Sequence, residues 1–156
     1  MKPRITAAAG LAVAIVAVSS SALLMGGNSN AAVSHTCSAT DRQFLGAAQL
    51  NMAALGTLSQ DYLQGDAKAD DVILQADSAV TSLVNTNPSD PSLSKTRTIL
   101  RAMFLNYGRA IRADKRHHDP GKYIYRAYGL ANFAHDVLAQ ARPALAERGC
   151  DVSPLL

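Results

Sequence analysis

Tryptophan is missing from this sequence of 156 residues, and aromatic residues make up only 5% of it. A hydrophobic core must therefore be built from Leu, Ile, Val, Met and abundant Ala, and each Ala side chain buries little apolar area. Because small side chains let helices approach closely, we expect long packed helices to provide most of the stability, with a covalent cross-link assisting them. The length fits one domain.

Common catalytic motifs are missing as well. The chain has no G-x-S-x-G nucleophile turn, no H-E-x-x-H metal motif and no Gly-rich phosphate loop. Glutamate occurs once, and the helical patterns place no pair of carboxylates on an inward face. The sequence therefore favours a protein that is not an enzyme, and an enzyme of unrecognised type is an alternative.

The N-terminus has the composition of an export signal. Lys2 and Arg4 are followed by an uncharged, mostly apolar run of 21 residues that ends at Met25. Small residues at Ser29 and Ala31 predict cleavage after Ala31, so residues 1–31 are expected to be a signal peptide. The same run is long enough to span a bilayer, so an uncleaved anchor is the alternative. The expected location is secreted or associated with the cell envelope.

Cysteine is scarce, with only Cys37 and Cys150 in the chain. The first lies just before the first helical pattern and the second just after the last, and their spacing matches no common zinc or redox signature. In an oxidising compartment, two such cysteines predict a single disulfide bond.

Positive charge is absent from most of the first half of the domain. Residues 37–92 carry two cations against seven Asp, a net charge of −5, whereas residues 93–150 carry eleven cations against four acids, a net charge of +7. Residues 32–156 as a whole carry 13 cations and 12 acids, a net charge of only +1, so the basic precursor is no argument for a nucleic-acid partner. The asymmetry predicts either two halves that face each other electrostatically or an interaction surface.

Apolar residues recur with a helical period, and no segment shows a convincing strand period. Short connections between the helices favour antiparallel neighbours, and therefore one up-down-up-down four-helix bundle over residues 32–156. In that topology Cys37 and Cys150 lie at the same end, and their bond would stabilise the fold by roughly 4–5 kcal/mol. The expected helices are residues 41–64, 67–84, 92–116 and 120–148.

Candidate helix ends can be assigned from capping residues. Thr40 is the expected N-cap of the first helix and Asp66 that of the second. Asp90 and Asp119 each precede a proline, a pattern typical of a helix start. Pro143 removes one backbone hydrogen bond inside the fourth helix, so we expect a kink or break there.

Cations of the third helix lie within an arc of about 120°, opposite its apolar stripe. One interpretation is a docking face for an anion, such as a wall polymer, acidic lipid headgroups, nucleic acid or an acidic protein. The other is a solvated outer face, partly compensated by Asp66, Asp70 and Asp77 of the second helix. No aromatic residue alternates with the arginines, so specific nucleic-acid binding is not expected. The residues are Arg97, Arg101, Arg109, Arg112, Lys115 and Arg116.

Histidine and tyrosine provide the remaining candidate ligands. His135 is the only histidine inside a helix, at the edge of the predicted buried face and near Tyr128. The architecture is loosely similar to small exported helical proteins that bind haem through Tyr or His, which makes His135 and Tyr128 candidate ligands. His117 and His118 beside Asp119 are better explained by an exposed loop than by a metal site.

The expected function is therefore contact with a partner protein or an anionic component of the cell envelope, without a cofactor. A carrier of haem or lipid between the helices is the main alternative. A membrane contact is expected only through residues 1–31, if they remain uncleaved.

Overall fold

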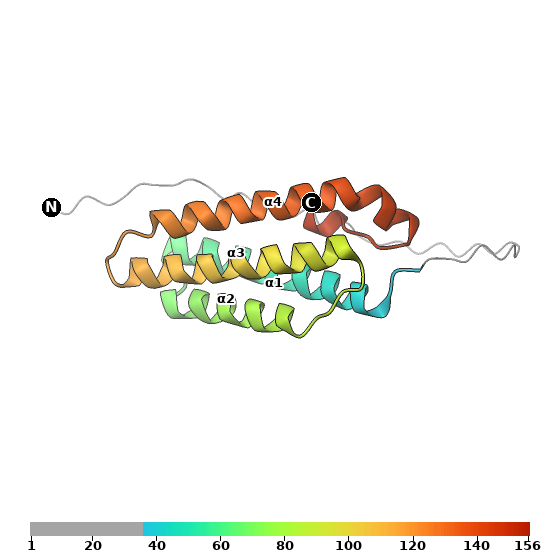
Figure 1. Cartoon of the computed structure of the whole chain (residues 1–156). Helices are drawn as coiled ribbons and strands as arrows, with labels where there is room; N and C mark the ends of the chain where they lie inside the picture. The colour runs from blue at the N-terminus through green and yellow to red at the C-terminus, as the bar shows by residue number, and fades with distance from the viewer. Residues whose placement is uncertain (1–35) are drawn as a thin grey trace, which may run out of the picture.

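The computed structural model of the chain describes residues 36–156 (Figure 1). Within that range the protein is entirely helical, which confirms the predicted all-α class. The predicted signal peptide, residues 1–31, lies outside the described residues. The helices are α1 (Ala39–Gln64), α2 (Ala69–Val84), α3 (Pro91–Lys115), α4 (Gly121–Glu147) and the short 3₁₀ helix η1 (Ser153–Leu155).

Successive long helices alternate in direction, and α3 lies between α2 and α4 (Figure 1). α3 has the most extensive contacts, along both α4 and α2, whereas α1 packs chiefly on α2. After Cys150 the chain folds back so that η1 contacts α1. None of the described helices is long and apolar enough to cross a membrane. Because α3 contacts three helices, only a strip along it faces outward.

The core consists of aliphatic side chains and two phenylalanines, as expected from the composition. Val152, beyond the last long helix, is also buried, so the C-terminal segment contributes to the core. The largest side chains with almost no exposure are Phe44, Phe104, Leu83, Leu93, Leu138 and Leu145.

A disulfide bond joins Cys37 to Cys150, with their Cα atoms 4.9 Å apart. It connects the segment just before α1 to the segment just after α4, as the sequence predicted. Both cysteines are buried. The bond therefore closes the domain at the end opposite the α3–α4 turn.

The N-caps of α1 and α2 differ from the prediction. Ser38, not Thr40, is the N-cap of α1, and its Oγ accepts a hydrogen bond of 3.0 Å from the backbone N–H of Asp41. Asp66 does not cap α2, because its backbone N–H is bonded to the carbonyl of Asp61, which keeps it in the terminal turn of α1. Lys68 takes the N-cap position of α2 instead.

The two Asp-Pro starts behave differently from each other. Asp90 caps α3 as predicted, and its Oδ1 accepts hydrogen bonds of 2.8 Å from Ser92 and 3.1 Å from Leu93. Asp119 accepts one hydrogen bond of 2.8 Å from the backbone N–H of Gly121, while Pro120 occupies the N-cap position of α4.

Pro143 does not break α4, which continues through it to Glu147. Pro143 and the residue four positions earlier, Ala139, are both exposed. Water can therefore satisfy the carbonyl that loses its hydrogen bond, and the helix is not forced to end.

Candidate functional site: a basic face on α3 and α4

Three of the six predicted cations of α3 bind α2. Arg112 forms an ion pair with Asp77, and the Lys115 ammonium lies 2.6 Å from Asp70 Oδ1. Arg97 donates a hydrogen bond to the carbonyl of Thr86, just beyond the end of α2. Part of the predicted arc is therefore a helix–helix contact, as the compensation by Asp70 and Asp77 had suggested.

The other three cations, Arg101, Arg109 and Arg116, form no ion pair with any acid in residues 36–156. Arg109 and Arg116 are exposed, and Arg101 is half-buried with an Nε that has no hydrogen-bond partner among the described residues. Uncompensated charge therefore remains on the outward strip of α3.

A flank of α4 extends this strip. The Lys95 ammonium of α3 lies 5.0 Å from the ring centroid of Phe133, which identifies the flank of α4 that borders the outward strip. Lys122 and Arg126 precede Phe133 by eleven and seven residues, spacings that place all three on one side of a helix. We define the basic face as Lys95, Arg101, Arg109, Arg112, Arg116, Lys122 and Arg126.

Sequence reasoning missed Lys95, Lys122 and Arg126 as members of this face. A single helix has a predictable apolar side, but its rotation against the next helix depends on packing. The sequence spacing shows that Arg126 and Phe133 lie on the same side of α4. Only the Lys95–Phe133 contact shows that this side of α4 lies next to α3.

Few acids oppose the basic face. Residues 95–126 contain nine Lys and Arg but only two carboxylates, Asp114 and Asp119, a net charge of +7. Asp114 Oδ2 accepts a hydrogen bond of 2.5 Å from the Tyr62 hydroxyl of α1, which raises the pKa of Tyr62 to about 12. Asp119 accepts a hydrogen bond from the backbone N–H of Gly121 at the start of α4. One of the two acids is thus turned toward α1, and the charge of the face is left largely uncompensated.

A hollow of about 270 Å³ lies at the corner where α3 turns into α4. Lys122 lies with its ammonium 4.8 Å from the Tyr123 ring centroid, beside the opening. The basic side chains that line the hollow are Arg109, Arg112, Arg116, His118 and Lys122, and Asp119 and Tyr123 line it as well.

The two turn histidines differ in position. His117 has a φ of 57°, the left-handed conformation that ends many helices and is usually taken by glycine. The His118 N–H then bonds the carbonyl of Ala113 at 2.9 Å, which folds the turn back over the end of α3. Both side chains are exposed, as predicted, but only His118 lines the hollow.

The ligand candidates His135 and Tyr128 are exposed on α4. The His135 Nδ1 lies 3.5 Å from Asp136 Oδ1, and neither His135 nor Tyr128 lines the corner hollow or the second hollow described next. His135 was expected at the edge of the buried face, but it is exposed because α4 packs mainly on α3 and its other sides face solvent. Haem binding through these residues stays a prediction.

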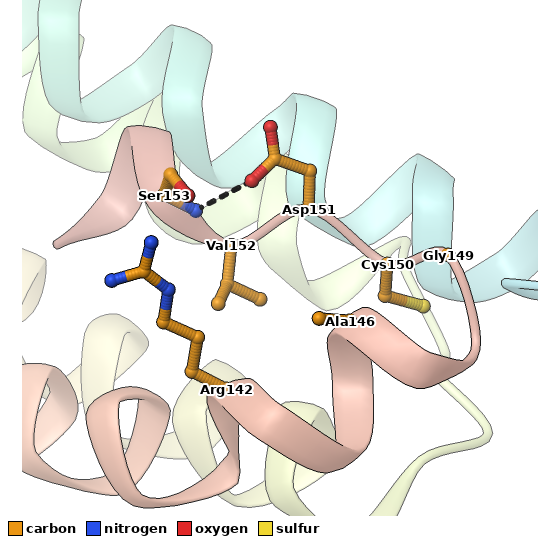
Figure 2. Close-up of a pocket in the computed structure, with 7 residues that line it drawn as sticks. All are labelled: Arg142, Ala146, Gly149, Cys150, Asp151, Val152 and Ser153. Carbon is orange, nitrogen blue, oxygen red and sulfur yellow. Dashed lines mark hydrogen bonds between the residues drawn. The ribbon is translucent and has the colours of Figure 1, made fainter.

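A second hollow, of about 300 Å³, lies beside the disulfide (Figure 2). Arg142 and Ala146 of α4 form one side, and residues 149–153 form the other. Asp151 Oδ1 accepts a hydrogen bond of 2.9 Å from the Ser153 N–H, and the pKa of Asp151 is lowered by hydrogen bonds from Ser153 and by the charge of Arg142. The negative charge of Asp151 and the positive charge of Arg142 balance each other, so this hollow favours neither an anionic nor a cationic ligand.

Cys37, Asp41 and Cys150 also lie close together, in the arrangement of a metal site. Both sulfur atoms are committed to the disulfide and provide no thiolate. The Asp41 oxygens accept hydrogen bonds from Ser89 and Asp90. This cluster is therefore explained as structural.

No protein-family model, curated protein or solved structure matches this chain.

Proposed function

We propose that this protein is exported through residues 1–31 and acts, without catalysis, by binding an anionic surface of the cell envelope through its basic face. A buried disulfide supports export, because such bonds persist in oxidising compartments. The export signal itself is a proposal from the sequence.

The observation that carries the proposal is a continuous strip of cations on two adjacent helices, of which only Arg112 has an ion-pair partner among the described residues. From Lys95 to Arg116 the strip extends about 32 Å along α3, at 1.5 Å per residue. Charges arranged over such a length suit an extended anionic polymer or a bilayer surface, where each nearby cation contributes about 1 kcal/mol.

An acidic protein is the less favoured partner. The centre of a protein–protein interface is usually poor in charge and rich in aromatic residues. On the basic face the exposed large apolar side chains are Leu105 and Phe133, and Phe133 is partly covered by Lys95.

Charge reversal tests the proposal. The double variant Arg109→Glu/Arg126→Glu changes one exposed cation on each helix of the face. We expect its retention on acidic vesicles or isolated cell wall to fall by at least roughly 30-fold, the equivalent of about 2 kcal/mol. Wild-type retention should weaken as salt rises, because screening shortens the range of exposed charges.

The matched control is Lys68→Glu/Arg142→Glu, which changes the net charge equally but lies in the α1–α2 turn and on the opposite flank of α4. It should keep at least half of the wild-type retention. Equal loss in both variants, or binding of the wild type that salt does not affect, would contradict a role for the basic face.

A further inference from the structure

We infer that the hollow at the α3–α4 corner binds a phosphoryl group, in the form of a phosphomonoester dianion. The inference rests on the proposed function, since it names the chemistry that one part of the basic face recognises. It adds a defined site to what would otherwise be a diffuse charged strip.

Arginines of α3 form one wall of the hollow. Arg109, Arg112 and Arg116 are separated by three and four residues, so they follow one another along the same side of the helix. Arg112 is held by its ion pair with Asp77, and it therefore reaches the hollow in a fixed position. Guanidinium groups in such a row can each donate two hydrogen bonds to phosphate oxygens.

The first turn of α4 forms the opposite wall. The Lys122 side chain lines the hollow, and the Lys122 backbone N–H has no hydrogen-bond partner among the described residues. The start of a helix carries a partial positive charge and unpaired N–H groups, both of which favour a bound anion. No acidic residue lies in the first turn of α4.

Charge balance selects the class of anion. Four cations line the hollow, and Arg112 is already paired with Asp77. The three others, Arg109, Arg116 and Lys122, face one lining carboxylate, Asp119, which already accepts the Gly121 N–H. A carboxylate ligand, with one charge, would leave most of these cations uncompensated. A phosphomonoester has a charge of about −1.5 to −2 at pH 7 and three acceptor oxygens, so it matches both the charge and the number of donors.

The strained turn supports the same arrangement. The left-handed backbone conformation of His117 is strained for a residue with a side chain, and glycine would avoid that strain. The turn brings the next residue, His118, to the edge of the hollow. In its protonated form His118 would add a further donor.

Two sources offer this chemistry: the headgroup of phosphatidic acid and a free phosphomonoester. The test therefore uses glycerol 3-phosphate as the soluble probe and vesicles containing phosphatidic acid as the lipid probe, with phosphatidylglycerol vesicles of equal surface charge for comparison. Backbone N–H resonances of His118 and Lys122 report binding of glycerol 3-phosphate by the folded protein.

The critical variant is Arg109→Ala/Arg116→Ala, and its matched control is Lys95→Ala/Arg126→Ala. Both remove two cations of the basic face, but only the first changes the lining of the hollow. We expect saturable shifts in the wild type, at least tenfold weaker binding in the first variant, and binding within about twofold of wild type in the control. Unchanged thermal melting of both variants would show that they fold.

The outcomes separate the two claims. Retention on anionic vesicles combined with equal weakening in both variants would overturn the phosphoryl site while leaving the basic face as a diffuse surface. Shifts that do not saturate would overturn the site as well. Saturable binding of glycerol 3-phosphate without retention on anionic vesicles or on isolated cell wall would support the site with a soluble ligand, and would contradict the proposed surface function. Preference for phosphatidic acid over phosphatidylglycerol would identify the lipid as the source.

Discussion

At the residue scale, the most constrained polar group is Asp41 in the first turn of α1. Its carboxylate accepts hydrogen bonds from the Ser89 N–H at 2.7 Å, the Ser89 hydroxyl at 2.9 Å and the Asp90 N–H at 3.0 Å. These contacts join α1 to the connection between α2 and α3, and Asp90 in turn caps α3 and pairs with Arg148 of α4. Two buried carboxylates, Asp41 and Asp90, therefore link α1, α3 and the end of α4 near the disulfide.

Replacing Asp41 should lower stability and remove a pH dependence. Burial by itself raises the pKa of Asp41, but hydrogen bonds from Asp90, Ser38 and Ser89 outweigh it, so the pKa is lowered on folding. A lowered pKa contributes stability that is present above the unfolded value of 3.8 and is lost as the pH falls through the folded value. We expect Asp41→Asn to cost about 1–3 kcal/mol at pH 7, measured by urea unfolding.

Below the unfolded pKa the difference between Asp41→Asn and the wild type should shrink, because protonation removes the same charge from the wild type. Asp66→Asn, at an exposed position, is the control and should change stability little. A constant difference between the Asp41 variant and the wild type from pH 7 to pH 2 would show that the carboxylate charge is not what stabilises this junction.

At the scale of the element, α2 and α3 are held close together at Gly108. A Cβ atom built at this buried glycine would lie 3.4 Å from the Ala76 Cβ and 3.2 Å from Arg112 Nη1. The same contact region contains the Arg112–Asp77 ion pair, which connects the basic face to α2. The absence of a side chain at Gly108 therefore allows both the close packing and the placement of Arg112.

Enlarging Gly108 tests this contact. Gly108→Val should destabilise the protein by about 1–3 kcal/mol, because the added methyl groups meet Ala76 and force the helices apart. The control is Gly129→Val on α4, where nothing lies within 4 Å of a new Cβ. That variant should be neutral or stabilising by up to about 0.5 kcal/mol, since valine has the higher helix propensity. Thermal melting of both variants measures the difference. Equal changes in melting temperature for Gly108→Val and Gly129→Val would contradict the close packing of α2 and α3 at Gly108.

At the scale of the whole molecule, the disulfide connects residues 113 positions apart. It also anchors the C-terminal segment, in which Val152 is buried and η1 lies on α1. Closing a chain loop of this length stabilises mainly by restricting the unfolded state. The sequence has no tryptophan and many alanines, and each alanine buries little apolar area. We therefore expect the disulfide bond to provide a large part of the stability of the folded state.

Removing the bond should cost about 4–5 kcal/mol, a large part of the roughly 5–15 kcal/mol that holds a typical domain folded. The measurement compares urea unfolding of the wild type with that of Cys37→Ser/Cys150→Ser. Closely similar unfolding midpoints would contradict the expectation. Reduction of the wild type should reproduce the result of the serine variant.

Local properties of the sequence determined the four helices and the cysteine pairing. Apolar periodicity is set within a few turns of chain, and two cysteines at the ends of an antiparallel array have only one possible partner each. Asp90 was predictable as a cap for the same reason, because its partners are two and three residues away.

Only the tertiary structure decided which charges are free to act. Arg112 and Lys115 look like Arg109 and Arg116 in the sequence, yet the first two meet Asp77 and Asp70 while the others face outward. Lys122 belongs to α4, and only the packing of α4 on α3 brings it beside the arginines of α3. These outcomes depend on how each helix is rotated against its neighbour, and that rotation is set by side-chain packing across the whole domain rather than by any local pattern.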